Sequence, residues 1–213
     1  IPGLPPKQGL YDPEQEKDSC GIGFVVNIKG QKSHTIVQQG LQILENLSHR
    51  GAQGCDPCTG DGAGILLQVP HEFLKRAASD VGVVLPNAGE YGVGMTFLPP
   101  QADARQQCEA LFSRIIGEEG ARLLGWRDVP VKSDAIGPVA RSTEPFMRQV
   151  FIRRDPAIND ELDFERKLYV IRKRAYNEIR TSTMAGAEYW YVVSLSCRTM
   201  VFKGMLLTTQ LDQ

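Results

Sequence analysis

Two kinds of apolar segment alternate along this chain, and their order limits the folds that it can adopt. Short runs rich in β-branched and aromatic residues are typical of strands, whereas apolar residues three or four positions apart are typical of one helix face. The helical spacing is clearest in the series Phe164, Leu168, Ile171, Ala175 and Ile179. The segments lack the regular cadence of a doubly wound parallel sheet. We therefore expect an α+β fold, with sheets packed face to face and helices outside.

These patterns give a set of expected elements. Strands are expected at 21–28, 65–69, 91–98, 123–127, 149–153, 189–195 and 199–203, and helices at 34–48, 70–79, 102–117 and 159–180. The first strand carries no charged residue, so we expect it to be buried on both faces. The glycine-rich stretch 49–64 and residues 130–145 are expected to be loops.

Composition and charge exclude several classes of partner. The 213 residues are 42% hydrophobic, which is enough for a sizeable core, and the net charge of -1 gives no field to gather nucleic acid or an anionic membrane. No apolar run approaches the roughly 18 residues that span a bilayer. Five cysteines without an export signal favour reduced thiols. The sequence predicts a cytoplasmic protein with neither a nucleic-acid nor a membrane partner.

Cys20 stands where a charged leader with four prolines, residues 1–19, meets the first expected strand. One interpretation is a small buried hydrophobe, the commonest role of a free cysteine. The charged residues before it exclude a lipid anchor, and Val26 stands where a dinucleotide loop needs glycine. The other interpretation is chemical. If the chain is cut before Cys20, the thiol gains a neighbouring α-amine with a pKa of about 8, and the nucleophile carries its own base.

Several motifs in order associate this chemistry with a family. They are CGIGF at 20–24, LENLSHRGA at 44–52, TGDGAGILLQVPHEFL at 59–74 and SLSCRTMVFKGML at 194–206. Together they resemble the start of the glutaminase domain of glutamate synthases, which are class II glutamine amidotransferases and N-terminal nucleophile hydrolases. The resemblance implies a four-layer αββα sandwich. It also implies that leader 1–19 is removed, that Cys20 cleaves glutamine to glutamate, and that ammonia passes to 2-oxoglutarate on another domain.

The same resemblance implies that residues 20–213 are the first half of the glutaminase domain. The family's oxyanion hole is an Asn-Gly pair, yet no asparagine of this sequence is followed by glycine. The arginine and the aspartate that hold glutamine are also expected beyond Gln213. Losing one oxyanion donor typically lowers a rate by about 100- to 1000-fold. The fragment alone is therefore expected to be nearly inactive.

Arg50, Gly51 and Asp61 are the supporting site residues that the resemblance suggests. Arg50 corresponds to an arginine close to the nucleophile, and the alternative is a charge at a helix end that Gly51 terminates. Asp61 corresponds to a family loop, and the alternative is a turn aspartate between glycines. Cys55 and Cys58 form Cys-x-x-Cys, but no second pair stands at ligand spacing. We expect no metal or cofactor site in this chain.

For the complete enzyme, the resemblance implies FMN and an iron–sulfur cluster on later domains. Glutamine is the implied substrate. The implied partners are the remaining glutamate synthase domains, with or without a small electron-delivering subunit. The alternative function is a non-catalytic docking or regulatory module of the same fold. In such a module the leader stays attached, and Cys20 has no free amine.

Overall fold

A four-stranded antiparallel sheet forms the centre of the fold. The computed structural model describes residues 6–10, 12, 20–51 and 56–211 of the chain. The sheet is ordered β3 (Arg122–Asp128), β4 (Phe146–Arg153), β2 (Tyr91–Leu98) and β5 (Tyr191–Ser196). A second sheet pairs β1 (Ala63–Gln68) with β6 (Thr199–Gly204). Every strand pair that the structure describes is antiparallel, and the expected α+β mixture of helices and sheets is confirmed.

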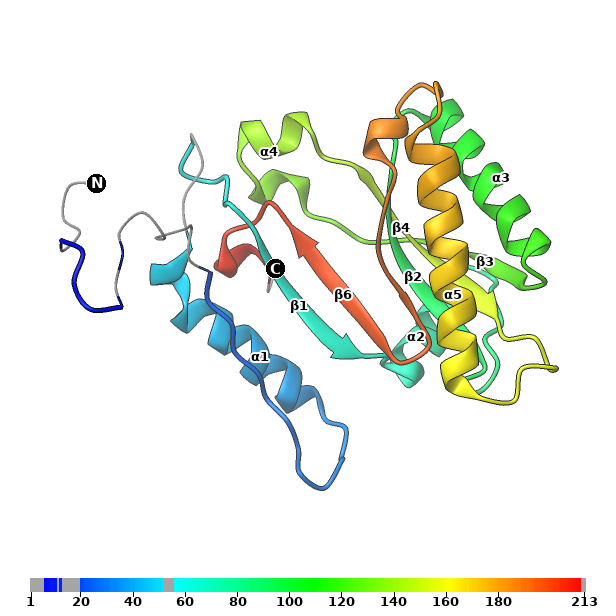
Figure 1. Ribbon diagram of the computed structural model, residues 1–213, viewed down its shortest axis with the longest axis horizontal. Helices are drawn as coiled ribbons and strands as arrows, with labels where there is room; N and C mark the ends of the chain where they lie inside the picture. Colours follow the sequence, from blue (N-terminus) through cyan, green and yellow to red (C-terminus); the bar gives the residue numbers. More distant parts are fainter. Residues whose placement is uncertain (1–5, 11, 13–19, 52–55, 212–213) are drawn as a thin grey trace.

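The helices lie outside these sheets (Figure 1). The α-helices are α1 (His34–Asn46), α2 (His71–Ser79), α3 (Ala102–Glu118), α4 (Pro138–Ser142) and α5 (Glu161–Ala175). Short turns of other helix types are η2 (Ser48–Arg50), η3 (Ser133–Ala135), η4 (Tyr176–Arg180), η5 (Ala187–Tyr189) and η6 (Thr208–Gln210). In Figure 1, α3 and α5 lie side by side against the four-stranded sheet, and α1 lies beyond the β1–β6 pair.

Alternate residues of the central strands point into two different hydrophobic cores, as strand geometry requires. Val150 and Ile152 of β4 face the helices, where Phe112 of α3 and Leu168 of α5 are fully buried. Phe151, between them, belongs to the core on the opposite face. That second core also contains Leu74 of α2, Tyr91 and Val93 of β2, and Met200 of β6. The four-stranded sheet is thus covered on both faces.

Glycines in β2 allow its neighbours to approach closely. A methyl group built at Gly92 would lie 2.6 Å from Leu168 Cδ1, and one built at Gly94 would lie 2.5 Å from Val150 Cγ1. A side chain at either position would have to displace Leu168 or Val150 in the fully buried core. Glycine therefore lets α5 rest directly on the central strand.

Phe112 should be among the residues on which stability depends most. Its ring is fully buried and lies 5.1 Å from the ring of Trp190 and 6.0 Å from that of Trp126, measured between centroids. We expect Phe112→Ala to lower the free energy of unfolding by about 3–5 kcal/mol, because it leaves a cavity. Urea denaturation would measure this. Phe73→Ala is the matched control. Because Phe73 is 47% exposed, this substitution should lower the free energy of unfolding by about 1 kcal/mol or less.

The prediction of a first strand at 21–28 is wrong. Residues 20–27 have no strand pairing and are followed by a turn, in which Gly30 N donates to Asn27 O at 2.9 Å, and the segment is not buried on both faces. Ile22 and Phe24 are each 87% exposed, and Ile28 is 98% exposed. The residue types favour a strand, but a strand also needs a partner edge, and no described strand lies beside this segment.

Residues 130–145 differ from the expected loop in containing η3 and the short helix α4. Pro138 is the first residue of α4. It lacks a backbone N–H, but at this position an N–H would have no hydrogen-bond partner within the helix. The other expected helices and strands are confirmed, with ends shifted by a few residues. The expectation for leader 1–19 lies largely outside the described residues.

Candidate functional site

Cys20 is exposed at the head of the unpaired segment 20–27. Two glycines bring this segment against α1. A methyl group built at Gly21 would lie 3.1 Å from Leu47 Cδ1, and one built at Gly23 would lie 2.3 Å from Ile43 Cγ2. The glycines of the CGIGF motif therefore form the contact with α1, and they leave Cys20 at the C-terminal end of this helix.

Arg50 lies at the same end of α1 as Cys20. Leu47, which touches Gly21, is the residue that ends α1, and η2 follows it directly. The backbone N–H of Arg50 donates to Leu47 O at 2.8 Å, so the turn folds back onto the helix end. The exposed guanidinium adds positive charge where the helix dipole is negative. The structure thus places Cys20 and Arg50 on neighbouring segments.

Gly51 and Asp61 are also close to each other. Asp61 Oδ1 lies 3.8 Å from the position of a methyl group built at Gly51. Gly60, the residue before Asp61, is buried against Leu206, and a methyl group built there would lie 2.1 Å from Leu206 O. The turn after α1, the loop before β1 and the chain after β6 therefore meet at this point.

The sequence patterns did not predict the contacts that hold the loop before β1. Residues 56–60, which we call the docked loop, bind the start of α4 through Asp56 and Thr59. Gln210 of η6 donates to Cys58 O at 2.9 Å and to Ala135 O at 2.6 Å. These partners lie about 80 and 150 residues away along the chain, so no local motif could reveal them.

The four described thiols have different surroundings. Cys20 and Cys58 are exposed, whereas Cys108 and Cys197 are buried. Burial raises the pKa of Cys108 to about 11. Burial, followed by the carboxylate of Glu165, raises the pKa of Cys197 to about 12. Neither buried thiol forms much thiolate at neutral pH, which leaves Cys20 and Cys58 as the accessible described nucleophiles.

The described residues contain neither a metal-binding group nor a membrane-spanning helix. Within 6–10, 12, 20–51 and 56–211, no three His, Cys, Asp or Glu side chains are grouped so that they could hold a metal ion. Cys55 of the Cys-x-x-Cys pair lies outside the described residues. None of the described helices has the length and apolar character needed to cross a membrane.

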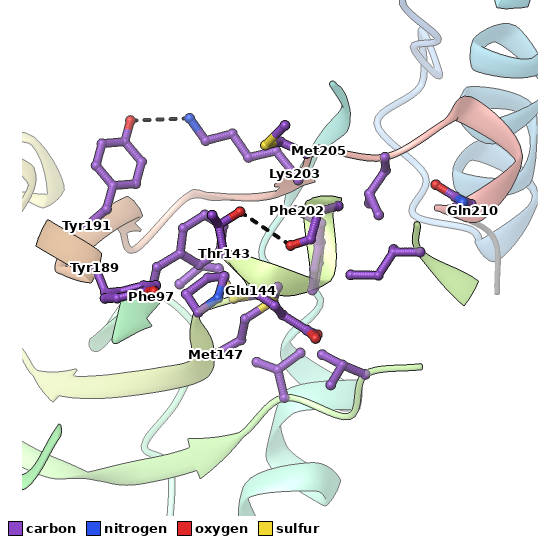
Figure 2. Close-up of a pocket in the computed structure, with 18 of the residues that line it drawn as sticks. Phe97, Thr143, Glu144, Met147, Tyr189, Tyr191, Phe202, Lys203, Met205 and Gln210 are labelled. Atoms are coloured by element: carbon purple, nitrogen blue, oxygen red, sulfur yellow. Dashed lines mark hydrogen bonds between the residues drawn. The ribbon is translucent and has the colours of Figure 1, made fainter. Parts of the chain in front are cut away.

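A cavity of about 660 Å³ lies between β2, β5, β6 and the segment that contains α4. Figure 2 shows its aromatic and methionine side chains, which include Phe97, Met147 and Phe202. Lys203 Nζ lies 3.2 Å from the Tyr191 hydroxyl at one end, and Gln210 lies at the other (Figure 2). None of the predicted site residues lines this cavity.

Most of this chain is similar to a known protein family. The sequence profile of a family described as glutamine amidotransferases class-II matches residues 20–213. The chain belongs to the class II glutamine amidotransferases. The match begins at Cys20 and extends to the end of this amidotransferase chain.

Curated relatives of this amidotransferase carry glutamate synthase names. Glutamate synthase [NADPH] large chain of Bacillus subtilis is 47% identical over 98% of this chain. Glutamate synthase [NADH] of Schizosaccharomyces pombe is 40% identical over 97%, and ferredoxin-dependent glutamate synthase 2 of Synechocystis is 37% identical over 90%. The chain spans 13%, 10% and 12% of the lengths of these relatives.

Proposed function

We propose that this chain is the first part of the glutaminase domain of a glutamate synthase, with Cys20 as its nucleophile. The observation that carries the proposal is the family match, which starts at Cys20 itself. The relatives with glutamate synthase names support the choice of enzyme. The exposed position of Cys20 supports its role, since glutamine must reach the sulfur.

The proposed reaction uses one residue as nucleophile and base. After removal of residues 1–19, the α-amine of Cys20 takes the thiol proton as Sγ attacks the side-chain amide carbon of glutamine. The amine then returns the proton to the leaving nitrogen, and ammonia departs from a glutamyl thioester. Water hydrolyses the thioester to glutamate and restores the thiol. Arg50, Gly51 and Asp61 are proposed to shape the site around this reaction.

The 213 residues alone should catalyse this reaction poorly. The sequence has no Asn-Gly pair to serve as the family's oxyanion hole. We place that pair and the residues that clamp glutamine in the chain beyond Gln213. The finer fold is proposed to be the four-layer αββα sandwich. The helices α3 and α5 outside one sheet, and α1 outside the β1–β6 pair, support it.

The cofactors of the complete enzyme are proposed to lie outside this chain. The described residues do not fit an iron–sulfur cluster, because no three of their Cys, His, Asp or Glu side chains are grouped to hold metal. We propose that FMN and the cluster are bound by later domains, which use the ammonia to convert 2-oxoglutarate to glutamate. A small electron-delivering subunit and a cytoplasmic location complete the proposal.

A glutamine analogue with a diazoketone at the δ-carbon tests the nucleophile. In the processed, complete enzyme we expect it to alkylate Cys20 and to leave Cys58 unmarked, because only Cys20 combines an amine with a glutamine pocket. Cys108 and Cys197 should stay unmarked because they are buried. Peptide mapping would locate the adduct.

Iodoacetamide is the matched control for this labelling, since it needs no substrate pocket and should modify both exposed thiols. Excess glutamine should protect Cys20 from the analogue. An analogue adduct on Cys58 or Cys55, or labelling that glutamine does not slow, would contradict the proposed function.

A further inference from the structure

The docked loop, residues 56–60, is held by hydrogen bonds to two other segments of the chain. Cys58 O accepts from Gly137 N at 3.0 Å and from Gln210 Nε2 at 2.9 Å. The Gln210 side chain is itself fixed, because its Oε1 accepts from Leu207 N at 2.7 Å. The loop is therefore tied both to the segment before α4 and to the turn that follows β6.

Asp56 and Thr59 complete the attachment to α4. The Asp56 carboxylate accepts from Thr59 Oγ1 at 2.7 Å, from Cys58 N at 3.0 Å and from Val139 N at 3.4 Å. Thr59 Oγ1 also accepts from Ala140 N at 3.4 Å. Val139 and Ala140 stand in the first turn of α4, where backbone N–H groups have no partner within the helix. Two side chains of a distant loop thus cap this helix.

The contact is also sterically tight. A methyl group built at Gly137 would lie 1.9 Å from Asp56 Oδ1 and 2.4 Å from Thr59 Oγ1. Thr59 is only 1% exposed, so water does not compete for its hydroxyl. The hydrogen bond from Thr59 is the main cause that holds the pKa of Asp56 below its ordinary value, so its carboxylate is ionised at neutral pH.

We propose that Asp56 and Thr59 are positioning residues that hold the docked loop, and with it the adjoining Asp61, in place as one wall of the glutamine site. This inference rests on the proposed function. Asp61 follows the loop directly, and its Oδ1 faces Gly51 beside the turn that carries Arg50. In the part of the chain that the structure describes, neither Asp56 nor Thr59 hydrogen-bonds to Cys20, so their loss should weaken glutamine binding and leave thiol reactivity unchanged.

Thr59→Val in the complete, processed enzyme tests the inference, because valine keeps the shape and removes the hydroxyl. We expect KM for glutamine to rise by about 10-fold, with kcat changed by about 2-fold or less. Labelling of Cys20 by the diazoketone analogue should slow by a similar factor, while iodoacetamide labelling should not. Hydrogen exchange at the amides of Val139 and Ala140 should accelerate as the loop is released.

Two variants serve as matched controls. Thr59→Ser keeps the hydroxyl and should restore KM to within about 2-fold of the unmodified enzyme. Thr143→Val removes a hydroxyl from the other end of α4, where Thr143 Oγ1 donates to Ala140 O at 3.3 Å, and KM should not change. If Thr59→Val does not fold, Asp56→Asn should show the same shift of KM in weaker form.

The outcomes separate this inference from the proposed function. If the unmodified enzyme releases no ammonia and the analogue does not label Cys20, the proposed function fails. If that enzyme is active but neither Thr59→Val nor Asp56→Asn changes KM, the positioning role is overturned. A fall in kcat with slower iodoacetamide labelling would also overturn it, because the loop would then support the nucleophile instead of the substrate.

Discussion

Cys20→Ser in the complete, processed enzyme should reduce ammonia release from glutamine by about 10⁴-fold or more, because the nucleophile is lost. A hydroxyl keeps nearly the same shape, but its pKa is far too high for an α-amine to activate it equally well. The fold should survive, since Cys20 is exposed and supports neither core. A coupled assay of glutamate formation, with thermal unfolding measured in parallel, would test both expectations.

Cys108→Ala provides the control for this substitution. Cys108 is fully buried in α3, on the helical side of the four-stranded sheet, so the variant should lose some stability and keep its glutaminase activity. Full activity in Cys20→Ser would remove the main support for a cysteine nucleophile. Equal loss of activity in both variants would indicate a general effect of thiol removal.

Retention of the leader should inactivate the enzyme. With residues 1–19 attached, the nitrogen of Cys20 is an amide and cannot accept the thiol proton. We expect glutamine hydrolysis to fall by about 100-fold or more, the usual contribution of a general base. The comparison is between a complete enzyme that begins at Cys20 and one that carries a single additional alanine before it.

The single alanine separates two effects of the leader. It blocks the amine but is too short to cover the site, so inactivity of this version assigns the effect to the base. If this version is active and only the full leader inhibits, the leader acts by covering the site, and Cys20 does not supply its own base. Mass spectrometry bears on the rival function, because a non-catalytic module would retain residues 1–19, whereas the enzyme should begin at Cys20.

The central sheet could be predicted because local signals and tertiary packing agree there. The strand expected at 91–98 is β2, with the same ends, and β2 is buried between two neighbouring strands. The apolar stripe from Phe164 to Ile179 became the buried face of α5 and η4. In both segments the spacing of apolar residues matches the face that the fold buries.

The segment 20–28 shows where this reasoning fails. Its β-branched and aromatic residues favour a strand, but the segment has no strand pairing, because pairing depends on an edge elsewhere in the molecule. In the candidate site, too, local motifs were predictable and long-range contacts were not. Cys20, Arg50, Gly51 and Asp61 stand in recognisable motifs, whereas Thr59 and Gln210 became visible only through hydrogen bonds to distant segments. The functional roles that we assign to the four motif residues stay predictions.

The close approach of the CGIGF segment to α1 also has a genetic consequence. A methyl group at position 23 would lie 2.3 Å from Ile43 Cγ2, an atom that moves only with χ1, and χ1 of a β-branched residue is stiff in a helix. The volumes allowed at positions 23 and 43 are therefore linked, although 20 residues separate them in the sequence. A lineage that acquires alanine at position 23 can keep Cys20 in place by losing bulk at position 43. These two positions should then be inherited as a compensating pair rather than vary independently.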